Sequence, residues 1–202
     1  MPRKLTGAFF RSLDGVVQGG GGPDEDPSGG FRFGGWTVPL TDASMDAPTG
    51  KLYDEPQYDL LLGKRTYDIF SGYWPNHQDQ PIGAKFQRIN KYVLTHSARP
   101  LSWSGSYNLS GETASVVTDL KASKGRDLLI QGSTTIYPAL LQAGLIDRLV
   151  LMTFPVLLGE GKRILDGPLR AGTWRLIDHS VADSGVVFTT YERAGGVKTG
   201  SF

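Results

Sequence analysis

LLIQGSTTIYPALLQAG, residues 128–144, contains the succession of elements that decides the fold. Its first three residues are aliphatic and predict a short buried strand, and GSTT at 132–135 predicts a small polar turn. Apolar side chains then recur at helical spacing from 136 to 141, and Gly144 is the residue type that commonly ends a helix. The stretch therefore predicts a strand, a turn and a helix.

The same order recurs on either side of this stretch. Residues 5–13 are apolar and aromatic and stop at the turn pair Asp14-Gly15, residues 58–62 lead through Gly63 into an amphipathic segment, and residues 92–95 lead into a break at 96–100. Further helices are predicted over 82–90 and over 113–124, where Thr113 or Ser115 would cap the start, and a buried strand is predicted at 149–152. The chain then predicts a hairpin of 174–181 and 186–191, joined by Asp183-Ser184-Gly185.

Alternating strands and helices require right-handed crossovers and a largely parallel sheet with helices on both faces. The terminal hairpin makes this α/β sheet mixed. The length of 202 residues fits one domain, which we place at 1–194 with a tail at 195–202.

Composition excludes several classes of protein. The chain has no cysteine and only three, widely separated histidines, so thiolate chemistry is excluded and no metal site is expected. With a net charge of +1 there is no basic field for nucleic acid or for an anionic membrane. The N-terminus lacks the apolar core of a signal peptide, and we expect a cytoplasmic protein with no membrane segment.

A glycine-rich segment separates the first two predicted strands. Residues 19–35 hold eight glycines, two prolines and three acidic residues. This composition suits either a mobile surface loop or a lid. Phe31, Phe33 and Trp36 favour the lid, because aromatic side chains are costly to leave in water. Either Trp36 or Phe33 would then plug the site.

The turns after the strands are small, hydroxylated or basic. In open α/β sheets, ligands bind beyond the carboxyl ends of the strands. Thr66 and the turn at 132–135 could hold a diphosphate on backbone N–H groups, and the cations Lys64, Arg65, His96 and Arg99 would suit a further phosphate, which indicates NADP rather than NAD. Each turn is also a common packing device, and no Walker or Rossmann glycine motif follows a strand.

Six motifs in this order resemble the dihydrofolate reductase superfamily, most closely the reductase domain of the bifunctional riboflavin-biosynthesis deaminase-reductase. They are SLDG at 12–15, LGKRTY at 62–67, VLTHS at 93–97, IQGSTTIY at 130–137, GLIDRL at 144–149 and PVLLGEG at 155–161. The resemblance implies a dihydrofolate reductase-like three-layer sandwich, bound NADPH, hydride transfer to a small pyrimidine or pterin-like molecule, and often a homodimer. The activity would be similar to that of a 5-amino-6-(5-phosphoribosylamino)uracil reductase.

The resemblance also implies roles for individual residues. Residues expected to hold the cofactor are Lys64, Arg65, Thr66, Thr95, His96 and Ser97 on the 2′-phosphate side, Gly132, Ser133, Thr134 and Thr135 at the diphosphate, and Tyr137 near the nicotinamide. Trp36, Gly159 and Gly161 would lie beside the substrate. Asp14 is the expected catalytic residue, which would orient the acceptor or relay a proton; it also fits an ordinary turn residue.

Two features depart from the family pattern. Ser133 replaces the second of two glycines, and Asp46, Asp54 and Glu55 give no clear match to the acid that protonates folate. Folate is therefore not the expected substrate, and no zinc-binding deaminase segment is present. Besides the reductase, a module that binds NADPH without catalysis and a purely structural protein remain open.

Overall fold

A computed structural model describes residues 2–54, 57–97, 99–167 and 169–201. Its centre is one eight-stranded sheet in the order β4-β3-β2-β5-β1-β6-β8-β7. The strands are β1 (Leu5–Ser12), β2 (Tyr58–Gly63), β3 (Lys91–Leu94), β4 (Ser106–Leu109), β5 (Asp127–Gln131), β6 (Arg148–Phe154), β7 (Trp174–Val181) and β8 (Val187–Arg193). The strands from β4 to β6 in this order are parallel, and β8 and β7 complete the sheet as an antiparallel hairpin.

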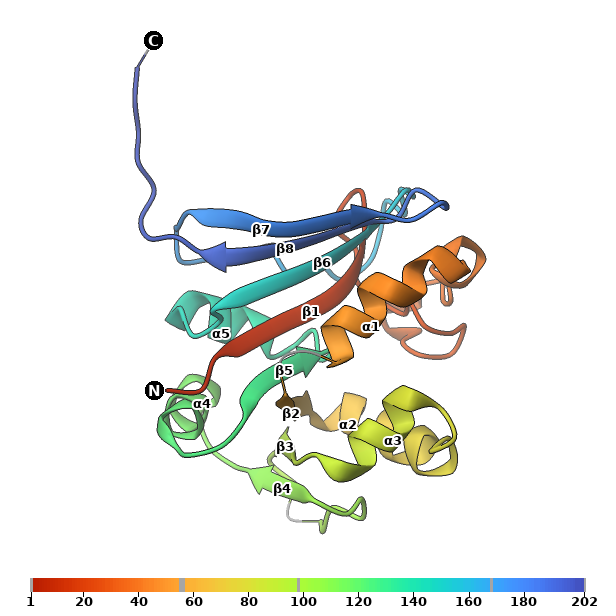
Figure 1. The fold of residues 1–202 in the computed structure, drawn as a ribbon, viewed down its shortest axis with the longest axis vertical. Coiled ribbons are helices and arrows are strands. Elements are labelled where there is room, and N and C mark those ends of the chain that lie inside the picture. The colour runs from red at the N-terminus through yellow and green to blue at the C-terminus, as the bar shows by residue number, and fades with distance from the viewer. Residues whose placement is uncertain (1, 55–56, 98, 168, 202) are drawn as a thin grey trace.

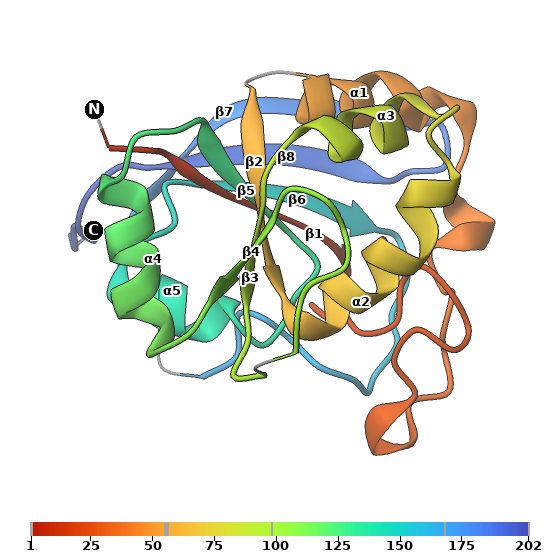
Figure 2. The same cartoon turned by 90° about the horizontal axis from the view of Figure 1, so that it is seen from below.

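Helices cover both faces of the sheet (Figure 1). They are α1 (Asp46–Asp54), α2 (Lys64–Tyr73), α3 (Pro81–Arg88), α4 (Thr113–Ala122) and α5 (Tyr137–Ala143). The first three share one hydrophobic core with their face of the sheet, and α4 and α5 share the other. Figure 2, looking from below, shows the two groups on opposite sides and the segment between β1 and α1 projecting beyond α2. The predicted three-layer mixed fold is confirmed.

The pattern of apolar residues predicted the central strands well, because these strands are buried on both faces of the sheet. All six residues of β2 are buried, and Gly144 ends α5 in the left-handed conformation at φ 71°. One detail was wrong. Glu112, rather than Thr113 or Ser115, caps α4 through bonds to two backbone N–H groups. The helix α5 begins at Tyr137, after the turn, as the sequence predicted.

The N-terminal and C-terminal parts of the chain are tied together at the hairpin. Asp42 accepts a hydrogen bond from the backbone N–H of Ser184 at 2.8 Å, and Ser44 accepts one from Asp183 at 2.8 Å. None of the helices in the described ranges is long and apolar enough to cross a membrane. No group of metal-ligating side chains occurs among the described residues.

Candidate functional site

The turn after β5 has an unusual backbone. Gly132 and Ser133 both have positive φ, at 64° and 59°, and Ser133 is the one non-glycine residue in the described ranges with this conformation. The Ser133 hydroxyl accepts a hydrogen bond from the backbone N–H of Gly63 at 2.8 Å. The Ser133 N–H in turn donates to the Thr66 hydroxyl at 3.0 Å. The turns that follow β2 and β5 are therefore locked to each other.

These hydrogen bonds between the two turns determine which backbone N–H groups remain free to bind a ligand. The Ser133 N–H is taken up by Thr66, whereas in the described part of the chain the N–H groups of Thr134 and Thr135 donate to no other atom. Thr135 is exposed, and Thr134 is partly so. Of the predicted diphosphate residues, these two offer free donors beyond the end of β5.

Lys64 and Arg65 point to different partners. The Lys64 ammonium pairs with Asp68 one turn along α2, at 2.6 Å. The Arg65 guanidinium leaves the helix and pairs with Asp26 at 2.9 Å, and it also donates to the carbonyl of Glu25 at 2.7 Å. In this structure the two cations therefore lie on different carboxylates, and their shared role at a 2′-phosphate stays a prediction.

The residues after β3 lie at the same edge of the sheet. The Thr95 side chain is buried and accepts a hydrogen bond from the Ser97 N–H at 3.0 Å. Asn108, from β4, donates to the Ser97 carbonyl at 3.0 Å. His96 between them is exposed. Since β3 neighbours β2, His96 is the member of this group that could approach a phosphate near Lys64.

Asp14 holds the segment that follows β6. One carboxylate oxygen accepts bonds from the Ser12 hydroxyl at 2.6 Å and the Leu158 N–H at 3.1 Å. The other accepts bonds from the Gly159 N–H and the Arg163 guanidinium, both at 2.9 Å. The bond from Ser12 lowers the pKa of Asp14 most, burial opposes this, and the remaining donors bring that pKa far below its ordinary value. Asp14 therefore stays ionised at neutral pH, and its predicted role at the acceptor stays a prediction.

Glycines shape the segment that Asp14 holds. Gly159 and Gly161 have φ of 78° and 121°, a conformation that favours glycine. A Cβ on Gly161 would lie 2.6 Å from Val16 and 2.9 Å from the ring of Phe31. Gly161 thus packs directly beneath the glycine-rich segment, and Gly159 binds Asp14.

Buried Gln18 joins the glycine-rich segment to the rest of the edge. Its amide donates to the carbonyls of Asp26 and Ser28, at 2.9 and 2.8 Å, and accepts from the Lys162 N–H at 3.1 Å. Its own carbonyl accepts a hydrogen bond from the Trp36 indole at 2.8 Å. Residues 19–36 are therefore anchored, not an unattached surface loop.

Trp36 and Tyr137 lie in the core of this structure. Trp36 is 8% exposed and packs edge-on against Phe154 at 5.4 Å. Tyr137 is fully buried, and its hydroxyl lies 3.1 Å from the carbonyl oxygens of both Ala8 and Ile130, where it can donate to either. Both residues support the edge from within, and their contacts with substrate and nicotinamide stay predictions.

Three acidic residues follow the glycine-rich segment in the sequence. Asp46 is exposed in the first turn of α1. Asp54 ends that helix, and Glu55 lies outside the described residues. A cavity of about 440 Å³ lies under α1 and is lined by residues of α1, β1, β2, β5, β6, β7 and β8. Its lining includes no residue of the turns at 63–66 and 132–135, so it is separate from them.

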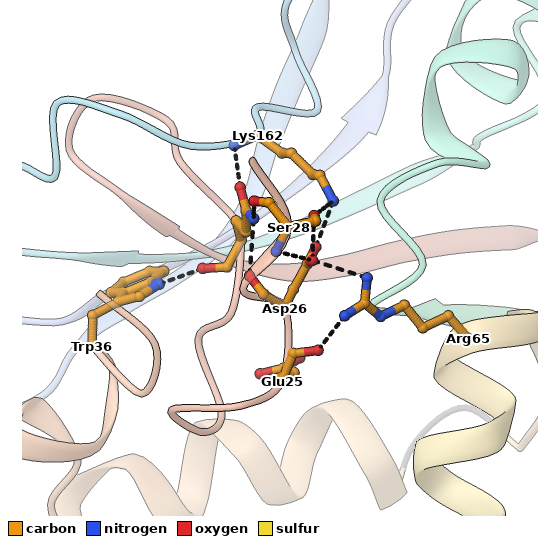
Figure 3. A network of polar contacts seen from close by, with 7 residues as sticks. Glu25, Asp26, Ser28, Trp36, Arg65 and Lys162 are labelled. Atoms are coloured by element: carbon orange, nitrogen blue, oxygen red, sulfur yellow. Dashed lines mark hydrogen bonds and ion pairs between the residues drawn. The ribbon is translucent and has the colours of Figure 1, made fainter. Parts of the chain in front are cut away.

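Sequence reasoning missed Gln18, Asp26 and Lys162. Asp26 is held by Arg65 on one side and by Lys162 at 2.6 Å on the other (Figure 3). A weak signal existed: Gln18 is a polar residue between a strand end and four glycines, and Lys162 directly follows the GEG of 159–161.

The sequence profile of the RibD C-terminal domain matches residues 3–188 of the chain. The chain belongs to the RibD C-terminal domain family. This RibD C-terminal domain is 23% identical over 140 residues to the uncharacterized protein YyaP of Bacillus subtilis strain 168, covering 67% of the chain and 74% of the relative.

Solved structures share the fold of this RibD C-terminal domain. A crystal structure from Shewanella sp. PV-4, named for riboflavin biosynthesis, superposes with a TM-score of 0.65 at 21% identity and covers 96% of this chain and 99% of that one. Dihydrofolate reductase from Enterococcus faecalis, complexed with NADP(H) and RAB-propyl, superposes with a TM-score of 0.56 at 16% identity, covering 94% and 96%. The RibD C-terminal domain therefore has a dihydrofolate reductase-like fold, as the sequence motifs implied.

Proposed function

We propose that this RibD C-terminal domain is an NADPH-dependent reductase that transfers a hydride to a small pyrimidine or pterin-like heterocycle. The observation that carries the proposal is the pair of locked turns after β2 and β5, which leaves the N–H groups of Thr134 and Thr135 free at the carboxyl edge. Backbone N–H groups of this kind bind phosphate oxygens. The similar dihydrofolate reductase from Enterococcus faecalis is complexed with NADP(H).

The residues at the edge would divide the work of binding and positioning. Thr134 and Thr135 would bind the diphosphate, and Lys64 with His96 would face the 2′-phosphate. Bound NADPH would supply the hydride. Asp14 would act as a positioning residue, because it fixes the segment of Gly159 and Gly161 beside the acceptor. Holding both reactants in place contributes most of the catalysis in such a transfer.

Titration of NADPH and NADH against intrinsic tryptophan fluorescence tests the cofactor. We expect tighter binding of NADPH, and oxidation of NADPH when pyrimidine or pterin heterocycles are added. Lys64→Ala should reduce the preference for NADPH over NADH by about tenfold, the loss of one charge-assisted contact. Lys51→Ala is the matched control, because Lys51 also pairs with an aspartate at 2.6 Å but lies on α1. Equal effects of the two variants would contradict the assignment of Lys64.

One observation favours a second candidate, a module that binds NADPH without turnover. The two carboxylate oxygens of Asp14 accept four hydrogen bonds from Ser12, Leu158, Gly159 and Arg163, an arrangement that suits a structural residue as well as a catalytic one. Tight NADPH binding without oxidation across a broad panel of heterocycles would select this module. The predicted homodimer and cytoplasmic location remain predictions; light scattering after size exclusion measures the first.

A further inference from the structure

The carboxylate of Asp26 is held by two cations that come from two distant segments of the chain (Figure 3). Its Oδ1 accepts from Arg65 at 2.9 Å and from the Ser28 hydroxyl at 2.5 Å. Its Oδ2 lies 2.6 Å from the ammonium of Lys162, which also donates to Ser28 at 2.7 Å. The Asp26 side chain is 13% exposed, whereas Arg65 and Lys162 are 56% and 42% exposed. The carboxylate thus sits inside a pocket of donors whose outer sides face water.

The two cations flank the strands that end at the proposed cofactor turn. Arg65 lies in the first turn of α2 after β2, and Lys162 follows β6, while β5 and β1 lie between those strands. The two cations thus come from strands on either side of β5 and β1 and meet at Asp26. The free amides of Thr134 and Thr135 follow β5 at the same edge.

Arginine and lysine donors around two oxygens are also what a phosphate group requires. A phosphate offers more oxygens and, as a monoester or diphosphate, more negative charge than one carboxylate. It therefore attracts the same two cations more strongly than Asp26 does. The carboxylate holds its place because it is tethered nearby in the same chain, which gives it a high local concentration.

The tip of the glycine-rich segment, residues 24–30, is attached to the rest of the protein mainly by polar contacts. Its neck is fixed separately, by a bond from the Gly35 N–H to the Gly19 carbonyl at 2.7 Å and by the Trp36 indole. Gly19 and Gly35 have φ of 61° and 78° and form the two ends of the neck. Polar contacts can be exchanged for contacts with a ligand and with water. The Asp26 carboxylate can therefore leave its two cations while Gln18 still holds the Asp26 and Ser28 carbonyls and the neck stays in place.

We propose that Arg65 and Lys162 form a phosphate-binding pair which the chain fills with its own Asp26, and that a phosphate-bearing ligand displaces this carboxylate. This proposal takes the identity of the ligand, a phosphorylated dinucleotide, from the proposed function. The binding of a phosphate group by Arg65 and Lys162 is argued from their contacts alone. Lys162 gains a role in ligand binding, and Asp26 becomes an internal competitor.

The first experiment removes the competitor. Calorimetric titrations with NADPH and, separately, with inorganic pyrophosphate compare Asp26→Asn with the unchanged protein. The variant should bind each ligand about fivefold more tightly, which is the free energy of one partly screened ion pair. Asp24→Asn removes the same charge two residues away, from a side chain with no hydrogen bond or ion pair to another described residue. The proposal is overturned if both variants gain equally, since the effect is then one of net charge, or if neither gains.

The second experiment tests whether Lys162 contacts the ligand or only holds the glycine-rich segment in place. In the Asp26→Asn background, Lys162→Gln should weaken pyrophosphate binding by about tenfold if Lys162 contacts phosphate. Arg32→Gln is the control, because Arg32 is 75% exposed and pairs with Glu160 beside the same segment. If Lys162 only held Asp26, its removal in this background would change nothing, and the proposal would be wrong.

A third measurement needs no variant. Pyrophosphate binding should increase amide hydrogen exchange of residues 24–30 in the unchanged protein, because the tip loses Arg65 and Lys162; slower or unchanged exchange contradicts displacement. The results distinguish this proposal from the proposed function. If all three experiments give the expected results with pyrophosphate but NADPH does not bind, the phosphate-binding pair is supported and the NADPH-dependent reductase is contradicted.

Discussion

Ser133 adopts a left-handed conformation that costs a residue with a side chain about 1 kcal/mol. Its hydroxyl repays this by accepting the Gly63 N–H. Ser133→Ala keeps the strain and loses the bond, so we expect unfolding in urea to show a loss of about 1–2 kcal/mol. Ser133→Gly loses the bond but relieves the strain, so it should change stability by less than about 1 kcal/mol. An alanine variant as stable as the glycine variant would contradict this account.

Lys91 is fully buried in β3 and donates to the Ser104 carbonyl at 2.9 Å. Burial lowers its pKa to about 8, partly opposed by the nearby charge of Asp59. An unfolded lysine has a pKa of about 10.4, so between these values the unfolded chain binds more protons and stability rises with pH.

We therefore predict that the free energy of unfolding, compared with that of Lys91→Met, increases between pH 8 and pH 10. Urea titrations of both proteins at pH 7, 8, 9 and 10 measure it. Lys4→Met, which changes an exposed lysine, is the control. Parallel pH profiles of the unchanged protein and Lys91→Met would show that Lys91 titrates alike in the folded and unfolded chain.

Among the elements, the segment from 155 to 163 depends on one side chain. Asp14 binds the Leu158 and Gly159 amides and Arg163. Asp14→Asn replaces an acceptor by a group that also donates, and we expect it to lower stability by about 2 kcal/mol. Hydrogen exchange of the amides of 158–163 should also become faster. Asp166→Asn changes an exposed acidic residue three positions after Arg163 and should leave both unchanged.

The sequence predicted the helices and strands that have a clear pattern of apolar residues. The strand β4 was missed because Ser106–Leu109 is a polar strand at the sheet's edge without a buried face. The helix α1 was missed because Pro48 and Gly50 interrupt its pattern; the proline is tolerated in the first turn, where its missing N–H is not needed.

At the site, local signals identified backbone turns but not the directions of side chains. Glycine and hydroxyl residues marked the turns at 63–66 and 132–135. Nothing in the sequence decides whether Arg65 turns to a phosphate or to Asp26, because Asp26 is 39 residues away and its neighbours are equally acidic. Such long-range pairs form only once the sheet places their strands side by side.

At the scale of the whole molecule, a buried ion pair joins the N-terminus to the middle of the sheet. Arg3 and Asp59 are 2.7 Å apart, with side chains 1% and 2% exposed, and Asp59 also accepts the Asn90 N–H at 3.1 Å. Asp59→Ala leaves a buried cation without its partner, so we expect a loss of about 3–5 kcal/mol in chemical unfolding. Asp178→Ala breaks an exposed pair with Lys51 and should cost less than about 1 kcal/mol. Equal losses would contradict the role of burial.

The tip of the glycine-rich segment has a consequence for synthesis of the chain. Asp26 leaves the ribosome 136 residues before Lys162. The strand β5 lies between β1 and β2 in the sheet and is made long after both. At a translation rate of roughly 5–20 residues per second, Asp26 therefore waits for on the order of ten seconds before the sheet can form around it. Both cations reach the carboxylate late in synthesis, when the sheet assembles.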